Sequence, residues 1–181
     1  MKYVALLRGV GPANPNMRNE RLREVFQGLD FQNVQTVISS GNVLFETPSR
    51  DVKGLERLIE AAIQMQLGFT STTIIRSHHH LKRLADNDVF GGIEDAPTTR
   101  LNVTFLKERR RINLQLPYFV EQKGYTVVSM RGREVFSVVD LTGATTPDLM
   151  SWLEKQFGKA ITTRTWKTVG RILNRLGAER R

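Results

Sequence analysis

Apolar residues recur with two different periods along the chain, which indicates alternating strands and helices. The spacing i, i+3, i+4 and i+7 predicts one helix after an Asn16 N-cap and another around Leu55–Ile63, stopped by Gly68. Short apolar or β-branched runs predict strands at residues 4–7, 34–39, 43–46 and 70–76. The resulting order, βαββαβ, is that of the ferredoxin-like unit.

The same order returns in the second half of the chain. Apolar runs predict strands at residues 101–106, 125–130, 135–140 and 161–163. Weaker helical spacing predicts a helix over Asn113–Gln122, with Pro117 inside it, and Thr146-Pro147-Asp148 is typical of a helix start. The sequence therefore predicts an α+β fold of two ferredoxin-like (βαββαβ) halves with an added C-terminal helix. We expect the first half at 1–77, a linking helix and acidic loop at 78–99, and the second half with the C-terminal helix at 100–181.

Composition narrows the class of protein. The chain has 181 residues, of which 40% are hydrophobic, so it can bury a substantial core. It has no cysteine, which excludes a disulfide framework, thiolate catalysis and cysteine-ligated zinc. The N-terminal stretch lacks a secretory signal pattern, and no window reaches the roughly 20 apolar residues of a membrane span. We therefore expect a cytoplasmic protein without a membrane partner.

Few residues point to catalysis. The three histidines, His78–His80, are consecutive, and neighbours on a helix point about 100° apart, so no two share a face as metal ligands would. The carboxylates form no pair suited to acid–base work, and no G-x-S-x-G serine motif occurs. The sequence predicts no metal or other cofactor and leans against an enzyme. A small-molecule enzyme of unknown reaction stays an alternative.

An anionic small molecule is the ligand that the sequence favours. Thr165 stands at an N-cap position before a helix over Trp166–Leu176, whose first N–H groups and positive dipole end attract negative groups. Three donor-rich segments would converge on the anion, and their residues are Arg8, Gly9, Ser40, Gly41, Asn42, Thr163, Arg164 and Thr168. The competing interpretation is structural, with Trp166 in the core and two ordinary turns.

The formal net charge of +9 indicates a nucleic acid as an alternative partner. The excess is concentrated in residues 100–111, with +4, and in residues 160–181, with +5. Contacts to a phosphate backbone need cations rather than a sequence motif. The residues that would make them are Lys107, Arg109, Arg110, Arg111, Lys167, Arg171 and Arg175. A solvated basic loop and a solvated helix face explain the same pattern without a partner.

Several segments together resemble a known protein family. In chain order they are YVALLRGV, the stretch Met17–Phe26, ISSGNVLFE, RLNVTFL and ITTRTWKTVGRIL. The pieces SGNV and TTR-x-W-x-TV are the most specific of these. The set resembles the bacterial family known as domain of unknown function 1697, over nearly the whole chain. The resemblance implies an α+β fold with two ferredoxin-like lobes and implies no established activity.

The resemblance also indicates which positions matter, and it adds Trp166 to the eight residues of the anion site. The chain departs from the family pattern twice. Pro12 and Pro15 stand where the family usually continues with a glycine-rich stretch, and Gly143–Pro147 stands where it tends to place a serine-lysine pair. Our hypothesis is a phosphate- or carboxylate-bearing ligand bound in a cleft between the halves. Ferredoxin-like sheets often pair at their edges, so a homodimer is compatible with this fold.

Overall fold

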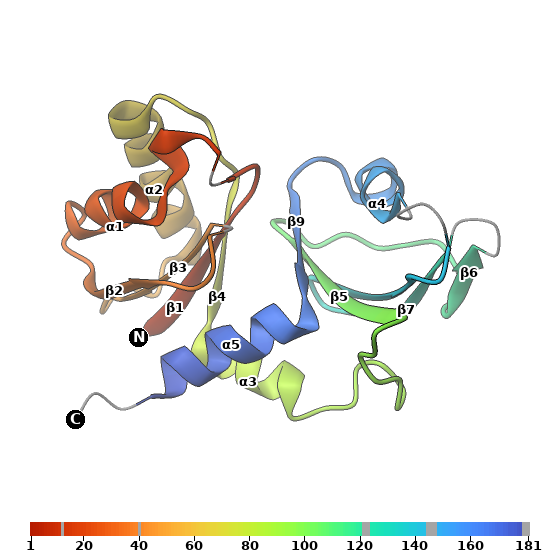
Figure 1. Cartoon of the computed structure of the whole chain (residues 1–181). Helices are drawn as coiled ribbons and strands as arrows, with labels where there is room; N and C mark the ends of the chain where they lie inside the picture. The colour runs from red at the N-terminus through yellow and green to blue at the C-terminus, as the bar shows by residue number, and fades with distance from the viewer. Residues whose placement is uncertain (12, 40, 121–123, 144–147, 179–181) are drawn as a thin grey trace. The chain divides into compact units, whose positions relative to one another are not determined.

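The computed structural model describes residues 1–11, 13–39, 41–120, 124–143 and 148–178 (Figure 1). The chain divides into two compact units, one of Met1–Arg83 with Gly170–Arg181 and one of Leu84–Val169. The last turns of the C-terminal helix therefore group with the first unit, while the boundaries expected from the sequence stay a prediction. None of the helices in the described ranges is long and apolar enough to cross a membrane.

The first unit contains a four-stranded sheet in the order β2-β3-β1-β4, in which every neighbouring pair is antiparallel. The elements from the N-terminus onward are β1 (Lys2–Leu7), a 3₁₀ turn (Pro15–Met17), α1 (Asn19–Gln27), β2 (Gln32–Thr36), β3 (Asn42–Glu46), α2 (Val52–Leu67), β4 (Thr73–Ser77) and α3 (His78–Ala85). The six strands and helices from β1 to β4 agree with the order predicted from hydrophobic spacing.

The second unit contains a five-stranded antiparallel sheet in the order β6-β7-β8-β5-β9. The remaining elements are β5 (Thr99–Leu106), β6 (Tyr118–Val120), β7 (Tyr125–Arg131), β8 (Glu134–Asp140), α4 (Leu149–Phe157), β9 (Ile161–Thr165) and α5 (Trp166–Gly177). The described residues thus form a mixed α/β fold with two antiparallel sheets and five α-helices.

The structure corrects two local predictions, and a third concerns a residue outside the described ranges. The prediction of a helix over Asn113–Gln122 is wrong, because Tyr118–Val120 forms the strand β6. The residue before Pro117 favours extended backbone, and the aromatic and β-branched residues after it favour a strand. Asn16 is not the N-cap of α1, which begins at Asn19 after the 3₁₀ turn. The predicted N-cap Thr146 lies outside the described residues, and α4 starts with the Asp148 carboxylate accepting from Ser151 N.

The first sheet is buried on both faces. The face under α1 and α2 carries Tyr3, Leu7 and Phe45, which pack against helix residues such as Phe26 and Ile59. Side chains alternate between faces along a strand, so Val4, Leu6, Leu44 and Ile74 point the other way. These four are at most 1% exposed. The opposite face therefore also requires a cover, and the end of α5 lies on that side, where Lys2 Nζ donates to Leu176 O (Figure 1).

The free edge of β4 is closed by carboxylates of α2. Glu56 is 2% exposed, and its Oε1 accepts a hydrogen bond from Ile75 N at 2.9 Å. One helical turn later, Glu60 Oε1 accepts from Thr73 N at 2.8 Å. A four-residue step on a helix and a two-residue step on a strand both span roughly 6 Å, so the two acceptors match alternate N–H groups. Unpaired N–H groups at a sheet edge would otherwise offer a template for another strand.

Replacement of Glu56 by Met keeps the length of the side chain and removes the acceptor. We expect Glu56→Met to lower the free energy of unfolding by about 1–3 kcal/mol, because the buried N–H of Ile75 loses its partner. Urea denaturation followed by circular dichroism measures this change. Gln64→Met, at an exposed position of the same helix, is the control and should change stability by less than about 0.5 kcal/mol. Equal stabilities of the two variants would contradict the role assigned to Glu56.

Candidate functional site

The turn before β3 is held by main-chain contacts with β1. Leu7 N donates to Gly41 O at 2.8 Å. Asn42 is buried, and its Nδ2 donates to Val37 O at 2.9 Å. The side-chain hydrogen bond gives a structural reason for asparagine at position 42, and the φ of 71° at Gly41 lies in the left-handed region that favours glycine. Ser40, the other candidate residue of this segment, lies outside the described residues.

Arg8 and Gly9 follow β1 and lie beside the start of β4. Arg8 N donates to Thr72 O at 2.9 Å, and Arg8 O accepts from Ser71 Oγ at 2.8 Å. Gly9 is exposed and has a φ of 71°, in the left-handed region. The first unit therefore brings the Arg8 backbone and the turn before β3 to the same end of β1. The binding role predicted for these residues stays a prediction.

The other predicted binding residues belong to the second unit and are engaged with their own strands. Thr163 Oγ1 lies 2.7 Å from Thr104 Oγ1 on the paired strand β5. Arg164 Nη1 donates to Thr162 Oγ1 at 2.7 Å and to Thr163 O at 2.9 Å. Burial lowers the pKa of Arg164 to about 10, which leaves the guanidinium charged at neutral pH. The side chain is therefore folded back along β9.

The start of α5 has a side-chain N-cap and a partly buried aromatic residue, Trp166. Thr168 N donates to Thr165 Oγ1 at 3.2 Å, which confirms Thr165 as the N-cap residue. The Trp166 ring packs edge-on against Phe90, with centroids 5.3 Å apart, and against Phe136 at 6.0 Å. This segment therefore has a packing role within the second unit, and the anion-binding role of its threonines stays a prediction.

The basic residues singled out for nucleic-acid binding differ in their surroundings. Arg109–Arg111 are exposed and make no side-chain hydrogen bond or ion pair with other described residues. Lys107 accepts a hydrogen bond from Arg133 through its main-chain oxygen. Lys167 Nζ lies 3.2 Å from Asp95 Oδ2 in the acidic loop, so its charge is partly neutralised. Arg171 and Arg175 are exposed on α5.

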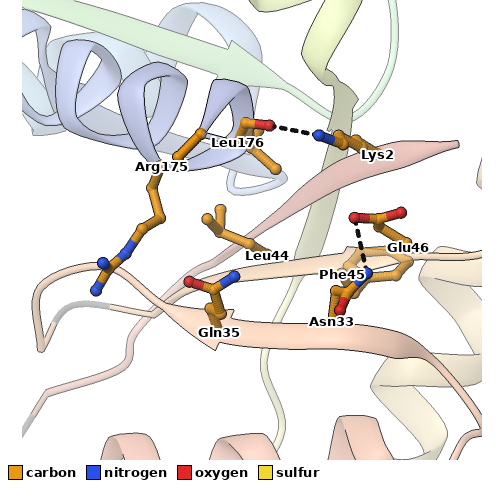
Figure 2. Close-up of a pocket in the computed structure, with 9 residues that line it drawn as sticks. Lys2, Asn33, Gln35, Leu44, Phe45, Glu46, Arg175 and Leu176 are labelled. Carbon is orange, nitrogen blue, oxygen red and sulfur yellow. Dashed lines mark hydrogen bonds between the residues drawn. The ribbon is translucent and has the colours of Figure 1, made fainter. Parts of the chain in front are cut away.

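A pocket on the outer face of the first sheet is the candidate functional site. It has a volume of about 100 Å³ and lies between the end of α5 and strands β1, β2 and β3 (Figure 2). The lining residues are Lys2, Asn33, Gln35, Leu44, Phe45, Glu46, Arg175, Leu176 and Ala178. All of them belong to the first unit. The lining combines charged groups and amides with the apolar side chains of Leu44 and Leu176.

The charges of the pocket are arranged by three elements. Lys2 Nζ donates to Leu176 O at 3.0 Å, which places a cation at the negative C-terminal end of α5. Glu46 is the direct cross-strand neighbour of Lys2, and its Oε1 accepts from Asn33 Nδ2 at 3.1 Å. Arg175 extends from α5 toward Gln35 on β2 (Figure 2). Neither Glu46 nor Arg175 forms an ion pair with another described residue.

His78 lies near the C-terminal end of α5. A Cβ placed on Gly177 would be 3.8 Å from His78 Nε2, so the imidazole adjoins the end of α5. Burial lowers the pKa of His78, and the nearby cations Lys2 and Lys82 lower it further. Within the described residues, no three His, Cys, Asp or Glu side chains gather so that they could hold a metal ion.

Comparison with known proteins identifies the family. The family model described as "Protein of unknown function (DUF1697)" matches residues 1–136. The chain belongs to this family. A search of curated proteins finds no match. Among solved structures, this DUF1697 protein is similar to the conserved bacterial protein SP0830 from Streptococcus pneumoniae, with 19% identity, a TM-score of 0.73 and 98% of each chain covered. The similarity shows that the two proteins share a fold.

Sequence reasoning missed most of the pocket of this DUF1697 protein. Of its nine lining residues, only Arg175 was singled out, and that as part of a nucleic-acid surface. Lys2 and Glu46 are 44 positions apart and become neighbours only through the register of β1 with β3. Had the predicted order of strands been used to align β1 with β3, this opposite-charge pair would have been an available signal.

Gly41 tests whether the turn before β3 requires glycine. Its φ is 71°, and a Cβ at this position would lie 3.0 Å from Leu7 Cβ and from Val10 Cβ. We expect Gly41→Ala to lower the free energy of unfolding by about 2–4 kcal/mol, from backbone strain and overpacking together. Gly9 has the same φ but would place a Cβ in open space, so Gly9→Ala should cost about 1–2 kcal/mol. Chemical denaturation of both variants measures these two free energies of unfolding. A smaller loss of stability for Gly41→Ala than for Gly9→Ala would refute the packing argument.

The lowered pKa of His78 predicts a pH dependence of stability. The unfolded chain, with a histidine pKa of 6.5, binds more protons than the folded chain as the pH falls below that value. The free energy of unfolding should therefore decrease as the pH is lowered through and below about 6.5. His78→Gln should make this decrease shallower in denaturation series between pH 7 and pH 5. An unchanged slope in the variant would show that His78 does not contribute.

Proposed function

We propose that this protein binds a small molecule through an anionic group, carboxylate or phosphate, in the pocket of the first unit. The single observation that carries the proposal is the presence of two cations, from the two ends of the chain, at one amide-lined pocket: Lys2 and Arg175. The proposal concerns binding, and it assigns no reaction to the protein.

Arg175 is the anchor for the anionic group. Its guanidinium offers five N–H donors in a planar fork that matches the geometry of a carboxylate or phosphate. It makes no ion pair with the described residues, so an anion would not have to displace a protein carboxylate. Lys2 adds positive potential, although one of its three N–H donors is used by Leu176 O.

Two amides on the edge strand β2 supply neutral hydrogen bonds. The Gln35 side chain makes no hydrogen bond with another described side chain, and Arg175 extends toward it (Figure 2). Asn33 uses one N–H on Glu46 and retains a second N–H and its carbonyl oxygen. Leu44 on β3 and Leu176 on α5 provide apolar surface in the pocket. A ligand with a short hydrocarbon portion beside its anionic group fits this distribution.

The proposed anion site lies on one face of the first unit, whereas the sequence predicted a site in a cleft between the halves. The joint site of Arg8, the turn before β3 and the start of α5 stays a prediction. We also infer that both sheets are variants of the ferredoxin-like arrangement. Support comes from the order β7-β8-β5-β9, which repeats the order β2-β3-β1-β4, with α4 in the place of α2. In the described second unit no helix takes the place of α1.

A nucleic acid is the second candidate ligand, because Arg109–Arg111 and Arg171 are exposed and have no ion partner among the described residues. The two candidates differ in what they require of α5. A phosphate backbone would use Arg171 and Arg175 alike, since they lie one turn apart on the exposed face, and binding would fall steeply with salt. A ligand of the pocket would use Arg175 alone.

Paired arginine substitutions distinguish the candidates. We expect Arg175→Gln to weaken the binding of butyrate or inorganic phosphate about three- to tenfold, as loss of a charge-assisted hydrogen bond implies, and Arg171→Gln to leave it unchanged. The measurement is a titration followed by ¹H–¹⁵N correlation spectra, with the side-chain amides of Asn33 and Gln35 as local reporters.

Two outcomes would count against the pocket. Equal weakening by both substitutions would favour the nucleic-acid candidate, which a titration with an oligonucleotide at two salt concentrations would then test directly. Absence of any shift at Asn33 and Gln35 at saturating concentrations of both anions would reject anion binding at this site.

A further inference from the structure

Glu46 places a negative charge in the pocket that Arg175 makes positive. It is the last residue of β3 and lies on the same sheet face as its cross-strand neighbour Lys2. Its Oε1 accepts from Asn33 Nδ2, which fixes the carboxylate against β2. A carboxylate has two oxygens that can accept about four hydrogen bonds, so this one contact leaves most of its capacity open.

Lys2 is the cross-strand neighbour of Glu46, but its ammonium group donates its hydrogen bond elsewhere. The ammonium group of Lys2 is directed to Leu176 O at the end of α5, where the helix dipole concentrates negative potential. No ion pair joins Lys2 to Glu46 in the described part of the chain. Besides Lys2, whose ammonium group is hydrogen-bonded to Leu176 O, the pocket therefore holds one cation, Arg175, and one anion, Glu46, without an ionic partner among the described residues.

The two charges occupy different parts of the pocket. Figure 2 shows the Arg175 guanidinium on the Gln35 side of Leu44, and the Glu46 carboxylate on the other side of Leu44, next to Asn33. A purely anionic ligand would satisfy Arg175 but would leave Glu46 facing a group of like charge. A ligand with charges of both signs would satisfy both residues, and its methylene groups would lie over Leu44.

We propose that the pocket is selective for zwitterions, with the anionic group on Arg175 and an ammonium group on Glu46, as in a short ω-amino acid. This proposal rests on the proposed function, because it assumes that the pocket binds an anionic group. It adds the second half of the ligand and assigns Glu46 as the residue that determines specificity. Specificity of this kind arises from a carboxylate that attracts one ligand and repels its competitor.

The test compares ligands of equal length that differ in one charge. The probes are ω-amino acids of two to six carbons, the alkyl carboxylates of the same length, and the corresponding alkylamines. Dissociation constants are obtained from ¹H–¹⁵N titrations of the full chain. We expect the best ω-amino acid to bind about two- to fivefold tighter than its matched carboxylate, the range for one partly exposed ion pair.

Glu46→Gln is the decisive variant because Gln retains an oxygen that can accept from Asn33. It should abolish the preference for the ω-amino acid while leaving carboxylate binding equal or slightly stronger. Glu94→Gln removes one negative charge at an exposed position of the second unit, and it should keep the wild-type preference. A preference that survives in Glu46→Gln would overturn the role of Glu46.

The failure of this inference can be told apart from the failure of the proposed function. If the wild-type protein binds carboxylates and ω-amino acids equally well, with shifts at Gln35, the zwitterion proposal is wrong and anion binding stands. If neither class shifts the pocket resonances, both proposals are wrong. If alkylamines alone bind, Glu46 is the sole anchor and the assignment of Arg175 is wrong.

Discussion

The two-sided burial of the first sheet is the constraint on which the rest of this unit depends. Strand β1 is apolar at every position from Tyr3 to Leu7, so it cannot leave one face in water. Helices α1 and α2 cover one face, and the end of α5 lies over the other. Because α5 follows β9 late in the chain, the first unit is completed only by residues that come after the whole second unit. The Lys2–Leu176 hydrogen bond joins these distant segments.

The end of α5 leaves part of this sheet face uncovered near the edge strand β2. The pocket lies there. The apolar side chains of α5, Ile172 and Leu176, are buried, whereas Arg171 and Arg175 lie on its exposed side. Near the edge strand β2 the sheet turns polar, and its exposed Gln32 and Asn33 cannot pack under a helix. A gap between a helix end and a polar sheet edge results. At the opposite edge, Glu56 and Glu60 close β4, so the two edges of one sheet have different chemistry.

Hydrophobic spacing predicts the elements of this fold well and predicts the pocket poorly. Leu55, Ile59 and Ile63 define α2 because helical packing needs apolar residues at that interval, and Thr165 marks the start of α5 because an N-cap needs a side-chain acceptor. Asn113–Gln122 misleads because its few apolar residues fit a helix and a strand equally. Lys2 and Glu46 carry no signal of their own, since a single charge at a strand end is ordinary until the register pairs it. Gly41 is recognisable in the sequence as a turn residue, but the closeness of Leu7 Cβ and Val10 Cβ to a Cβ at this position is a property of the folded chain.

The central claim is that a ligand lies between the end of α5 and the first sheet. Intermolecular nuclear Overhauser effects between a bound ω-amino acid and the protein's methyl groups measure this contact directly. The claim predicts effects from the ligand methylenes to the methyl groups of both Leu44 and Leu176, which line the pocket from opposite sides. Effects confined to methyl groups elsewhere in the protein, with none to Leu44 or Leu176, would contradict it.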